Sequence, residues 1–146
     1  TPAVVALAAA LEIVDKIRDE QVARVTALRD ELVTRVLQVA PDARLGGDPV
    51  GRLAGNAHFT FPGCLGDSLL MLLDAAGVEC SVGSACSAGV PQPSHVLLAM
   101  GADAQDARST LRFSLGYNST RDDVDALISA LPAAIERARR AGLPRA

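Results

Sequence analysis

The stretch Thr110-Leu111-Arg112-Phe113-Ser114-Leu115 decides the fold class, because its apolar and polar side chains alternate. Alternation with a period of two predicts a β-strand with one buried face. Leu111, Phe113 and Leu115 share that face, so Arg112 lies on the opposite one. The pattern fits two roles for Arg112 equally well. It is either an arginine on the polar face of a half-buried sheet or a fixed guanidinium that grips a carboxylate.

Two further strands are expected upstream. Residues 57–61 alternate, are rich in aromatic and β-branched side chains, and end at Pro62-Gly63. Residues 78–81 are a short strand candidate. Between the first helix and these strands, residues 41–56 are rich in glycine, proline and aspartate, which predicts an exposed loop.

Helical periodicity predicts four helices around this sheet. They cover residues 3–37, 67–76, 94–100 and a final stretch with its apolar stripe from Val124 to Ile135. The last helix is preceded by Thr120-Arg121-Asp122-Asp123, which resembles a capping box, and Pro132 should kink it. Helices on a small sheet place the chain in the α/β or α+β class.

The first predicted helix is too long for the domain. Residues 3–37 contain no glycine or proline, and such a helix runs roughly 50 Å. A globule of this length is only roughly 40 Å across. Either the helix bends, or its alanine-rich first half packs on a body outside this chain, and we favour the second explanation.

Length and composition exclude several classes of protein. The 146 residues suffice for one domain with a core, and 21% are charged, with a net charge of −3. This balance argues against a nucleic-acid partner or an anionic membrane surface. No apolar run approaches the roughly 20 residues of a membrane span. Three cysteines are an odd number, which favours a reducing, cytoplasmic location.

Cys86 is the candidate nucleophile. It lies within Ser81-Val82-Gly83-Ser84-Ala85-Cys86-Ser87-Ala88-Gly89, where small residues surround a single thiol on a predicted loop of about a dozen residues. A loop gives such a thiol the exposure that a reactive cysteine needs. The alternative is a free cysteine that fills a small gap in the core.

The other cysteines and the histidines favour structural roles. Cys64 and Cys80 are expected to be buried, His58 to face the sheet, and His95 to face solvent in the first turn of a helix. Together these four residues suggest zinc only weakly, because the sequence has no C-x2-C pair. No metal site is predicted.

Three motifs resemble one enzyme family. They are Cys80-Ser81-Val82-Gly83-Ser84-Ala85-Cys86-Ser87-Ala88-Gly89, Pro93-Ser94-His95-Val96-Leu97 followed by Met100-Gly101, and Leu111-Arg112-Phe113-Ser114-Leu115-Gly116. In this order they resemble the C-terminal region of cysteine desulfurases, which are pyridoxal-phosphate enzymes of the aminotransferase class V type. The similarity is to the branch that supplies sulfur for iron–sulfur clusters and tRNA thiolation. It covers the whole chain.

The resemblance implies roles for two residues. Cys86 would be the nucleophile that takes sulfur from L-cysteine as a persulfide and releases L-alanine, and Arg112 would bind the substrate α-carboxylate. The fold would be the C-terminal small domain of a fold-type I pyridoxal-phosphate transferase. A homodimer and a sulfur acceptor, such as an iron–sulfur scaffold protein, would be its partners.

One departure from the family limits this expectation. The family's cofactor lysine lies upstream of the matched region, and Lys16, the only lysine here, falls in the middle of the first helix. We therefore expect residues 1–37 to connect to a pyridoxal-phosphate-binding large domain outside this chain. Residues 38–146 would form the small domain with the catalytic cysteine loop. The chain alone would be inactive.

Three other functions remain open from the sequence. The chain is alternatively part of another class V aminotransferase or lyase in which Cys86 is incidental. It is otherwise a non-enzymatic sulfur-carrier or metal-binding module, or a structural, regulatory fragment. Turnover that survives mutation of Cys86 would favour the other class V enzyme. Bound metal would favour the sulfur-carrier or metal-binding module.

Overall fold

A three-stranded antiparallel sheet organises the computed structural model, which describes residues 1–82 and 93–142. The strands lie in the order β1-β2-β3. In chain order the elements are α1 (Pro2–Val39), β1 (Arg44–Leu45), β2 (Asn56–Thr60), α2 (Gly66–Asp74), α3 (His95–Ala99), α4 (Ala104–Arg108), β3 (Thr110–Ser114) and α5 (Arg121–Gly142).

The predicted alternation separates the two faces of the sheet. Phe59 of β2 pairs with Leu111 of β3, and both side chains are fully buried. The next pair along the ladder is His58 with Arg112, and these side chains point to the opposite face. The register thus directs the apolar side chains into the core. The polar side chains lie on the opposite face of the sheet, away from the core.

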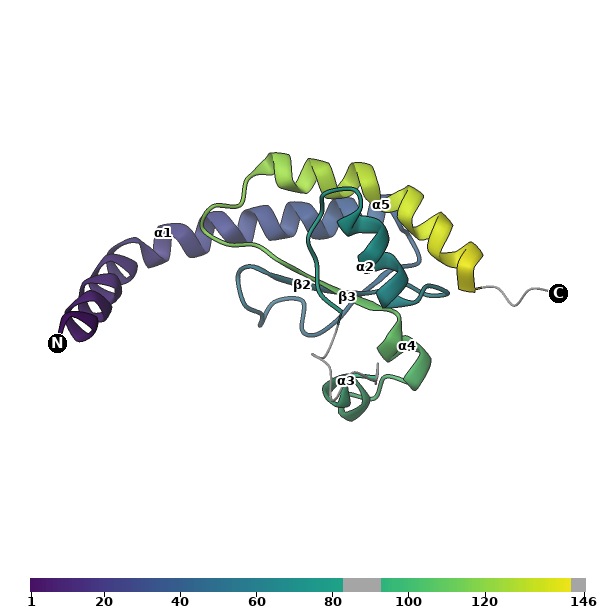
Figure 1. The fold of residues 1–146 in the computed structure, drawn as a ribbon, viewed down its shortest axis with the longest axis horizontal. Coiled ribbons are helices and arrows are strands. Elements are labelled where there is room, and N and C mark those ends of the chain that lie inside the picture. Colours follow the sequence, from purple (N-terminus) through teal and green to yellow (C-terminus); the bar gives the residue numbers. More distant parts are fainter. Residues whose placement is uncertain (83–92, 143–146) are drawn as a thin grey trace.

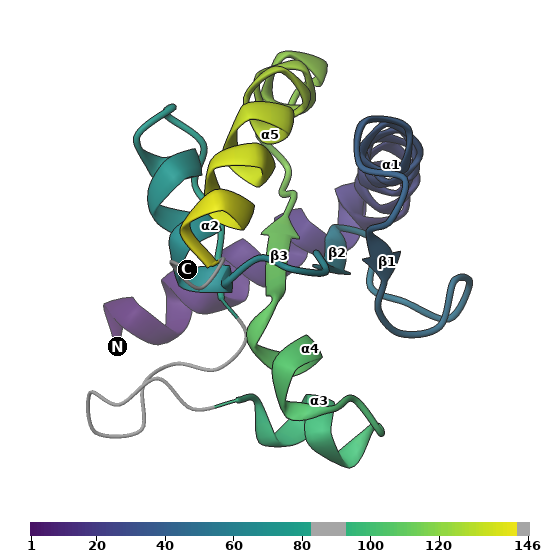
Figure 2. The ribbon, with the colours of Figure 1, turned by 90° about the vertical axis from the view of Figure 1, so that its right-hand side faces the viewer.

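Three helices cover the apolar face. α1, α2 and α5 lie together on one side of the sheet, whereas α3 and α4 lie on the other side (Figure 2). Each of the three covering helices contributes a stripe of buried side chains, as their amphipathic patterns predict. The buried residues include Leu32 and Val36 of α1, Leu69 and Leu73 of α2, and Val124, Leu127 and Leu131 of α5. This α+β arrangement confirms the predicted fold class.

Local signals place several helix ends correctly. Gly77 takes a φ of 79° after α2, and the N–H of Val78 reaches back to the Leu73 carbonyl at 2.9 Å. At the start of α5, the Asp123 carboxylate accepts a 2.8 Å hydrogen bond from the Thr120 N–H. α5 continues as one helix through Pro132. Ser94 precedes α3 as expected, but its side chain makes no capping hydrogen bond.

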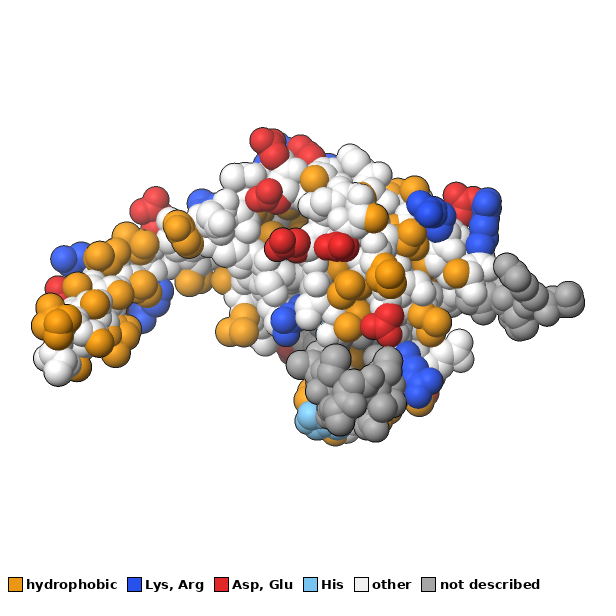
Figure 3. All heavy atoms as spheres, in the orientation of Figure 1, with side chains coloured by type: hydrophobic (Ala, Val, Ile, Leu, Met, Phe, Trp, Pro, Cys, Tyr) orange, Lys and Arg blue, Asp and Glu red, His pale blue; other side chains and the backbone are white. Residues whose placement is uncertain are grey.

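α1 extends beyond the domain as its length predicts. Its 38 residues span roughly 57 Å at the usual helical rise. Every residue up to position 20 is exposed, and the first buried one is Val25. The ribbon curves, but the curve leaves the N-terminal half projecting from the domain (Figure 1). Hydrophobic side chains gather over this projecting half (Figure 3). The exposed apolar residues of this part of α1 include Val4, Val5, Leu7, Leu11 and Val14.

Three details differ from the sequence-based expectation. Residues 78–81 do not form a strand, because only Ser81 pairs, in a single bridge with Arg112. β1 lies within the stretch that was expected to be a loop, since two residues beside β2 suffice to extend the sheet. α4 was not predicted at all. It has five residues, too few for an apolar periodicity to show, and Asp103 caps it through the Asp106 N–H.

None of the described helices combines the length and apolar character needed to cross a membrane.

The uneven burial along the chain predicts that two leucine substitutions differ sharply in cost. Leu73→Ala, at a fully buried position, should lower the free energy of unfolding of this chain by about 2–5 kcal/mol. Leu11→Ala should change it by less than about 0.5 kcal/mol, because Leu11 is 61% exposed. Urea unfolding followed by circular dichroism measures both. Equal losses would contradict the described packing.

Candidate functional site

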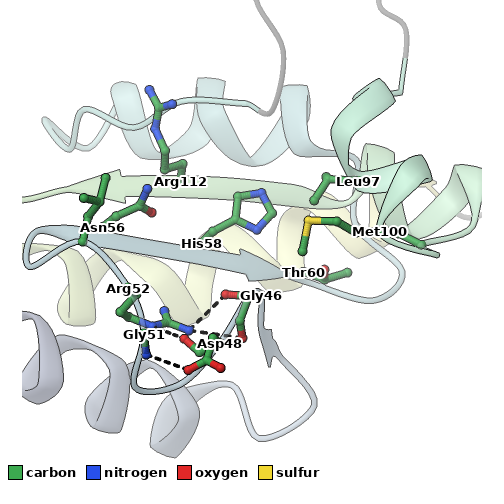
Figure 4. Close-up of a pocket in the computed structure, with 13 residues that line it drawn as sticks. Gly46, Asp48, Gly51, Arg52, Asn56, His58, Thr60, Leu97, Met100 and Arg112 are labelled. Carbon is green, nitrogen blue, oxygen red and sulfur yellow. Dashed lines mark hydrogen bonds between the residues drawn. The ribbon is translucent and has the colours of Figure 1, made fainter.

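A pocket of about 420 Å³ opens on the polar face of the sheet. Its floor is formed by β2 and β3, with His58 and Arg112 side by side (Figure 4). One wall is the loop over residues 46–53, and another is formed by Leu97 and Met100 at α3. The two strands therefore present polar groups within a cavity that has partly apolar walls.

Arg112 is held rigidly by its backbone. Its N–H donates to the Ser81 carbonyl at 2.8 Å, and its carbonyl accepts from the Ser81 N–H at 3.1 Å. Its guanidinium, in contrast, makes no hydrogen bond or ion pair with any residue that the structure describes. An unpaired guanidinium at a pocket, carried by a backbone that is held in a sheet, is suited to bidentate binding of a carboxylate.

The second arginine of the pocket is already engaged. Arg52 donates hydrogen bonds to the carbonyls of Asp48, at 2.7 Å, and Gly46, at 3.1 Å. Asp48 in turn accepts from the N–H groups of Val50 and Gly51, at 2.7 and 2.6 Å. Arg52 thus stiffens the 46–53 loop, and Arg112 is the cation of the pocket that is available to a ligand.

The buried Arg29 anchors the other end of the loop to α1. Its Nη1 donates to the Leu53 carbonyl at 3.0 Å, and its Nε pairs with Asp30 at 2.8 Å. The wall of the pocket is therefore supported from the helical layer on the far side of the domain.

His58 lies directly across from Arg112. Burial, and then the nearby positive charge of Arg112, lower the pKa of the imidazole from its usual value. Both effects disfavour the protonated ring, so His58 is neutral at pH 7. The expected sheet position of His58 is confirmed, and the structure places it in the same pocket as Arg112.

Cys86, the predicted nucleophile, lies outside the described residues. The chain leads to it from Ser81, which is hydrogen-bonded to Arg112. Four residues lie between the two positions, and the five Cα-to-Cα steps from Ser81 to Cys86 span at most roughly 17 Å. Chain length alone therefore keeps Cys86 within reach of the Arg112 pocket.

The two described cysteines have unreactive surroundings. Cys64 is buried, as expected, with its Sγ 3.9 Å from the Ile135 carbonyl oxygen. Burial raises the pKa of the Cys64 thiol. Cys80 is half-buried against the core, and burial, with the nearby Asp74, raises its pKa to about 11. Both thiols are therefore protonated at neutral pH.

The described residues supply neither a metal centre nor a cofactor lysine. Across residues 1–82 and 93–142, no three His, Cys, Asp or Glu side chains come together as a metal site. His95 is exposed at the start of α3, as expected. Lys16, the one lysine of the sequence, is exposed on α1 and does not line the pocket. This part of the chain therefore does not fit pyridoxal phosphate by itself.

The chain is similar to proteins of one known family. A family model described as aminotransferase class-V matches residues 1–127, and the chain belongs to this family. It is 58% identical over 144 residues to the IscS-like cysteine desulfurase of Mycobacterium tuberculosis, covering 97% of this chain and 36% of that protein. It is 41% identical over 138 residues to cysteine desulfurase IscS 1 of Archaeoglobus fulgidus, covering 94% and 36%.

A solved structure gives the same result. The NifS-like protein from Rickettsia africae superposes with a TM-score of 0.72 at 25% identity, over 83% of this chain and 31% of that one. The chain thus spans about a third of the length of the relatives it matches. The resemblance stated from the motifs is confirmed.

Sequence reasoning missed the wall of the pocket. The 46–53 stretch was predicted only as an exposed loop, although its Asp48 and glycines are typical of tight turns. Arg52 gave no signal, because its partners are backbone carbonyls that no side-chain pattern reveals. His58 was placed on the sheet but was not linked to Arg112, since register is not readable from one strand alone.

The raised pKa of Cys80 predicts slow alkylation. At pH 8 a thiol with a pKa of about 11 has about a hundredfold less thiolate than one at the ordinary value of 9.0. Iodoacetamide should therefore label Cys80 far more slowly in the folded protein than in urea, and the rate should rise up to pH 10. Peptide mass spectrometry measures both rates. Equal labelling in the two states at pH 8 would refute the protected environment.

Proposed function

We propose that this chain is the C-terminal part of a cysteine desulfurase that converts L-cysteine to L-alanine and carries the sulfur away as a persulfide. Arg112 binds the α-carboxylate of L-cysteine, and Cys86 is the sulfur acceptor. One observation carries this proposal: the unpaired guanidinium of Arg112 stands at a pocket, and its backbone is bonded to the segment that leads to Cys86. The named cysteine desulfurases among its relatives support it.

The reaction balances without an external oxidant. The carbon–sulfur bond of L-cysteine breaks, a sulfur–sulfur bond forms on Cys86, and the carbon that loses sulfur gains a proton. L-Cysteine and the Cys86 thiol thus yield L-alanine and a Cys86 persulfide. A thiolate is the nucleophile such a step needs, and Cys64 and Cys80 are held as thiols by their raised pKa values.

The described residues of this chain do three things in this reaction. Arg112 fixes the substrate by its carboxylate, the stiffened 46–53 loop closes one side of the pocket, and the apolar side chains at α3 limit water on the other. Pyridoxal phosphate, which the family implies, is assigned to residues outside this chain. In the same proposal residues 1–37 join the small domain of residues 38–146 to that cofactor-binding domain, and the exposed apolar residues of α1 pack on it.

The assembly around this chain is proposed from the same family. The whole enzyme is a cytoplasmic homodimer that hands its persulfide sulfur to an acceptor protein, for iron–sulfur cluster assembly or tRNA thiolation. The competing function is another class V aminotransferase or lyase, for which Cys86 is dispensable. A short sulfur-carrier or metal-binding module is the remaining alternative.

Persulfide mapping tests the proposal directly. The full-length protein, loaded with pyridoxal phosphate, is mixed with L-cysteine, alkylated, digested and analysed by mass spectrometry. We expect one extra sulfur on the Cys86 peptide together with release of alanine, and loss of both in Cys86→Ala. Alanine formation that survives Cys86→Ala would instead favour the competing aminotransferase or lyase.

Removal of the Arg112 guanidinium should weaken substrate binding. Arg112→Ala deletes a charge-assisted contact to the carboxylate, so KM for L-cysteine should rise roughly 10- to 100-fold. Arg137→Ala is the matched control, because Arg137 is exposed on α5 away from the pocket. Steady-state alanine release gives both values. An unchanged KM in Arg112→Ala would exclude the carboxylate role.

A further inference from the structure

His58 and Arg112 form a non-hydrogen-bonded pair of the antiparallel ladder between β2 and β3. The backbone N–H and carbonyl of Arg112 both bond to Ser81, so neither bonds to His58. In an antiparallel ladder, such a non-hydrogen-bonded pair has its Cα atoms only about 4.5 Å apart and its side chains closest. The imidazole and the guanidinium therefore start from neighbouring positions on the same face of the sheet, and both residues line the pocket. In Figure 4 the guanidinium extends away from the ring, but it has no partner among the described residues, so its side chain can rotate toward a ligand beside His58.

The imidazole has no partner of its own. Within residues 1–82 and 93–142, the two ring nitrogens of His58 make no hydrogen bond. Neither nitrogen is a fully buried atom that lacks a partner. The nitrogens are thus open to the pocket. A half-buried polar ring at the wall of a cavity gains stability once a ligand supplies its partner.

We propose that His58 is a second carboxylate-binding residue of the Arg112 site, whose neutral imidazole donates one N–H to the carboxylate that the Arg112 guanidinium binds. This inference rests on the proposed function and names a further specificity-determining residue for it. Arg52 is bonded to the backbone of its own loop, so Arg112 and His58 supply the unpaired cation and the neutral donor that a single carboxylate can use.

The other charged groups around His58 are engaged elsewhere. Arg52 and Asp48 of the 46–53 loop bind the backbone of that loop. Arg44 of β1, on the outer side of β2, pairs with Asp106 of α4 at 2.6 Å. Arg112 is therefore the charge that acts on His58, and the lowered pKa of the ring keeps the donor neutral at the pH of the assay.

Gly46 fixes the position of the ring. Its N–H donates to the His58 carbonyl at 2.8 Å, and a Cβ at Gly46 would lie 2.8 Å from His58 Nδ1. Gly46 does not have a positive φ, so the backbone conformation itself accepts alanine. The contact with His58 Nδ1 is then the main effect of the added Cβ. Gly46→Ala therefore displaces the imidazole, and Arg137→Ala, at an exposed position of α5 away from the pocket, serves as the control.

The test uses the full-length, cofactor-loaded enzyme with His58→Phe, His58→Gln, Gly46→Ala and the control Arg137→Ala. His58→Phe and Gly46→Ala should raise KM for L-cysteine about five- to tenfold, the change expected from one hydrogen bond, with little effect on kcat. His58→Gln keeps an N–H donor and should stay within about twofold of wild type, as should Arg137→Ala. Calorimetric binding of L-alanine should weaken in parallel, whereas L-alaninamide, which lacks the carboxylate, should bind all variants equally.

The pH profile adds a readout that packing alone does not move. Protonation of His58 adds a positive charge, so wild-type KM should fall as pH drops through the lowered pKa of the ring, below 6.5. His58→Gln should lack this inflection. Normal L-alanine affinity in His58→Phe, with weakened affinity in Arg112→Ala, would overturn the role of His58 and leave the proposed function standing. Normal affinity in Arg112→Ala as well would overturn the carboxylate site itself.

Discussion

The structure depends on the register between β2 and β3. This single pairing places Phe59 opposite Leu111 in the core and His58 opposite Arg112 on the other face. A slip by one residue would bury the two polar side chains and expose the aromatic ones, so hydrophobic burial under α1, α2 and α5 fixes the register. The energy that folds the domain is thus also what positions the pocket.

The second constraint is the bridge between Ser81 and Arg112. One residue pair makes both backbone hydrogen bonds, and it tethers the chain leading to Cys86 beside Arg112. A full strand at 78–81 would hold more residues of this segment against the sheet. The single bridge instead holds the described end of this segment at one point.

Elements with strong periodicity were predictable from the sequence. The long α1, the strands around Phe59 and Phe113, and the stripe of α5 each follow from side-chain spacing. β1 and α4 were not predictable, because two and five residues carry no measurable period. Arg112 was identified by its place on a strand and by the resemblance. His58 and Arg52 could be assigned to the candidate site only from the structure. The strand register places His58 beside Arg112, and hydrogen bonds to backbone carbonyls place Arg52 in the pocket wall.

The division of roles among the cysteines follows from the same packing. Cys64 lies under α5, and Cys80 packs at the edge of the core, where burial raises the pKa of each thiol. Placed this way, both fill space and are poor nucleophiles at neutral pH. Cys86 stands instead in a run of serine, alanine and glycine, whose small side chains offer little apolar surface for burying a thiol. Apolar burial thus makes Cys64 and Cys80 poor nucleophiles, which leaves Cys86 as the thiol that the proposed function uses.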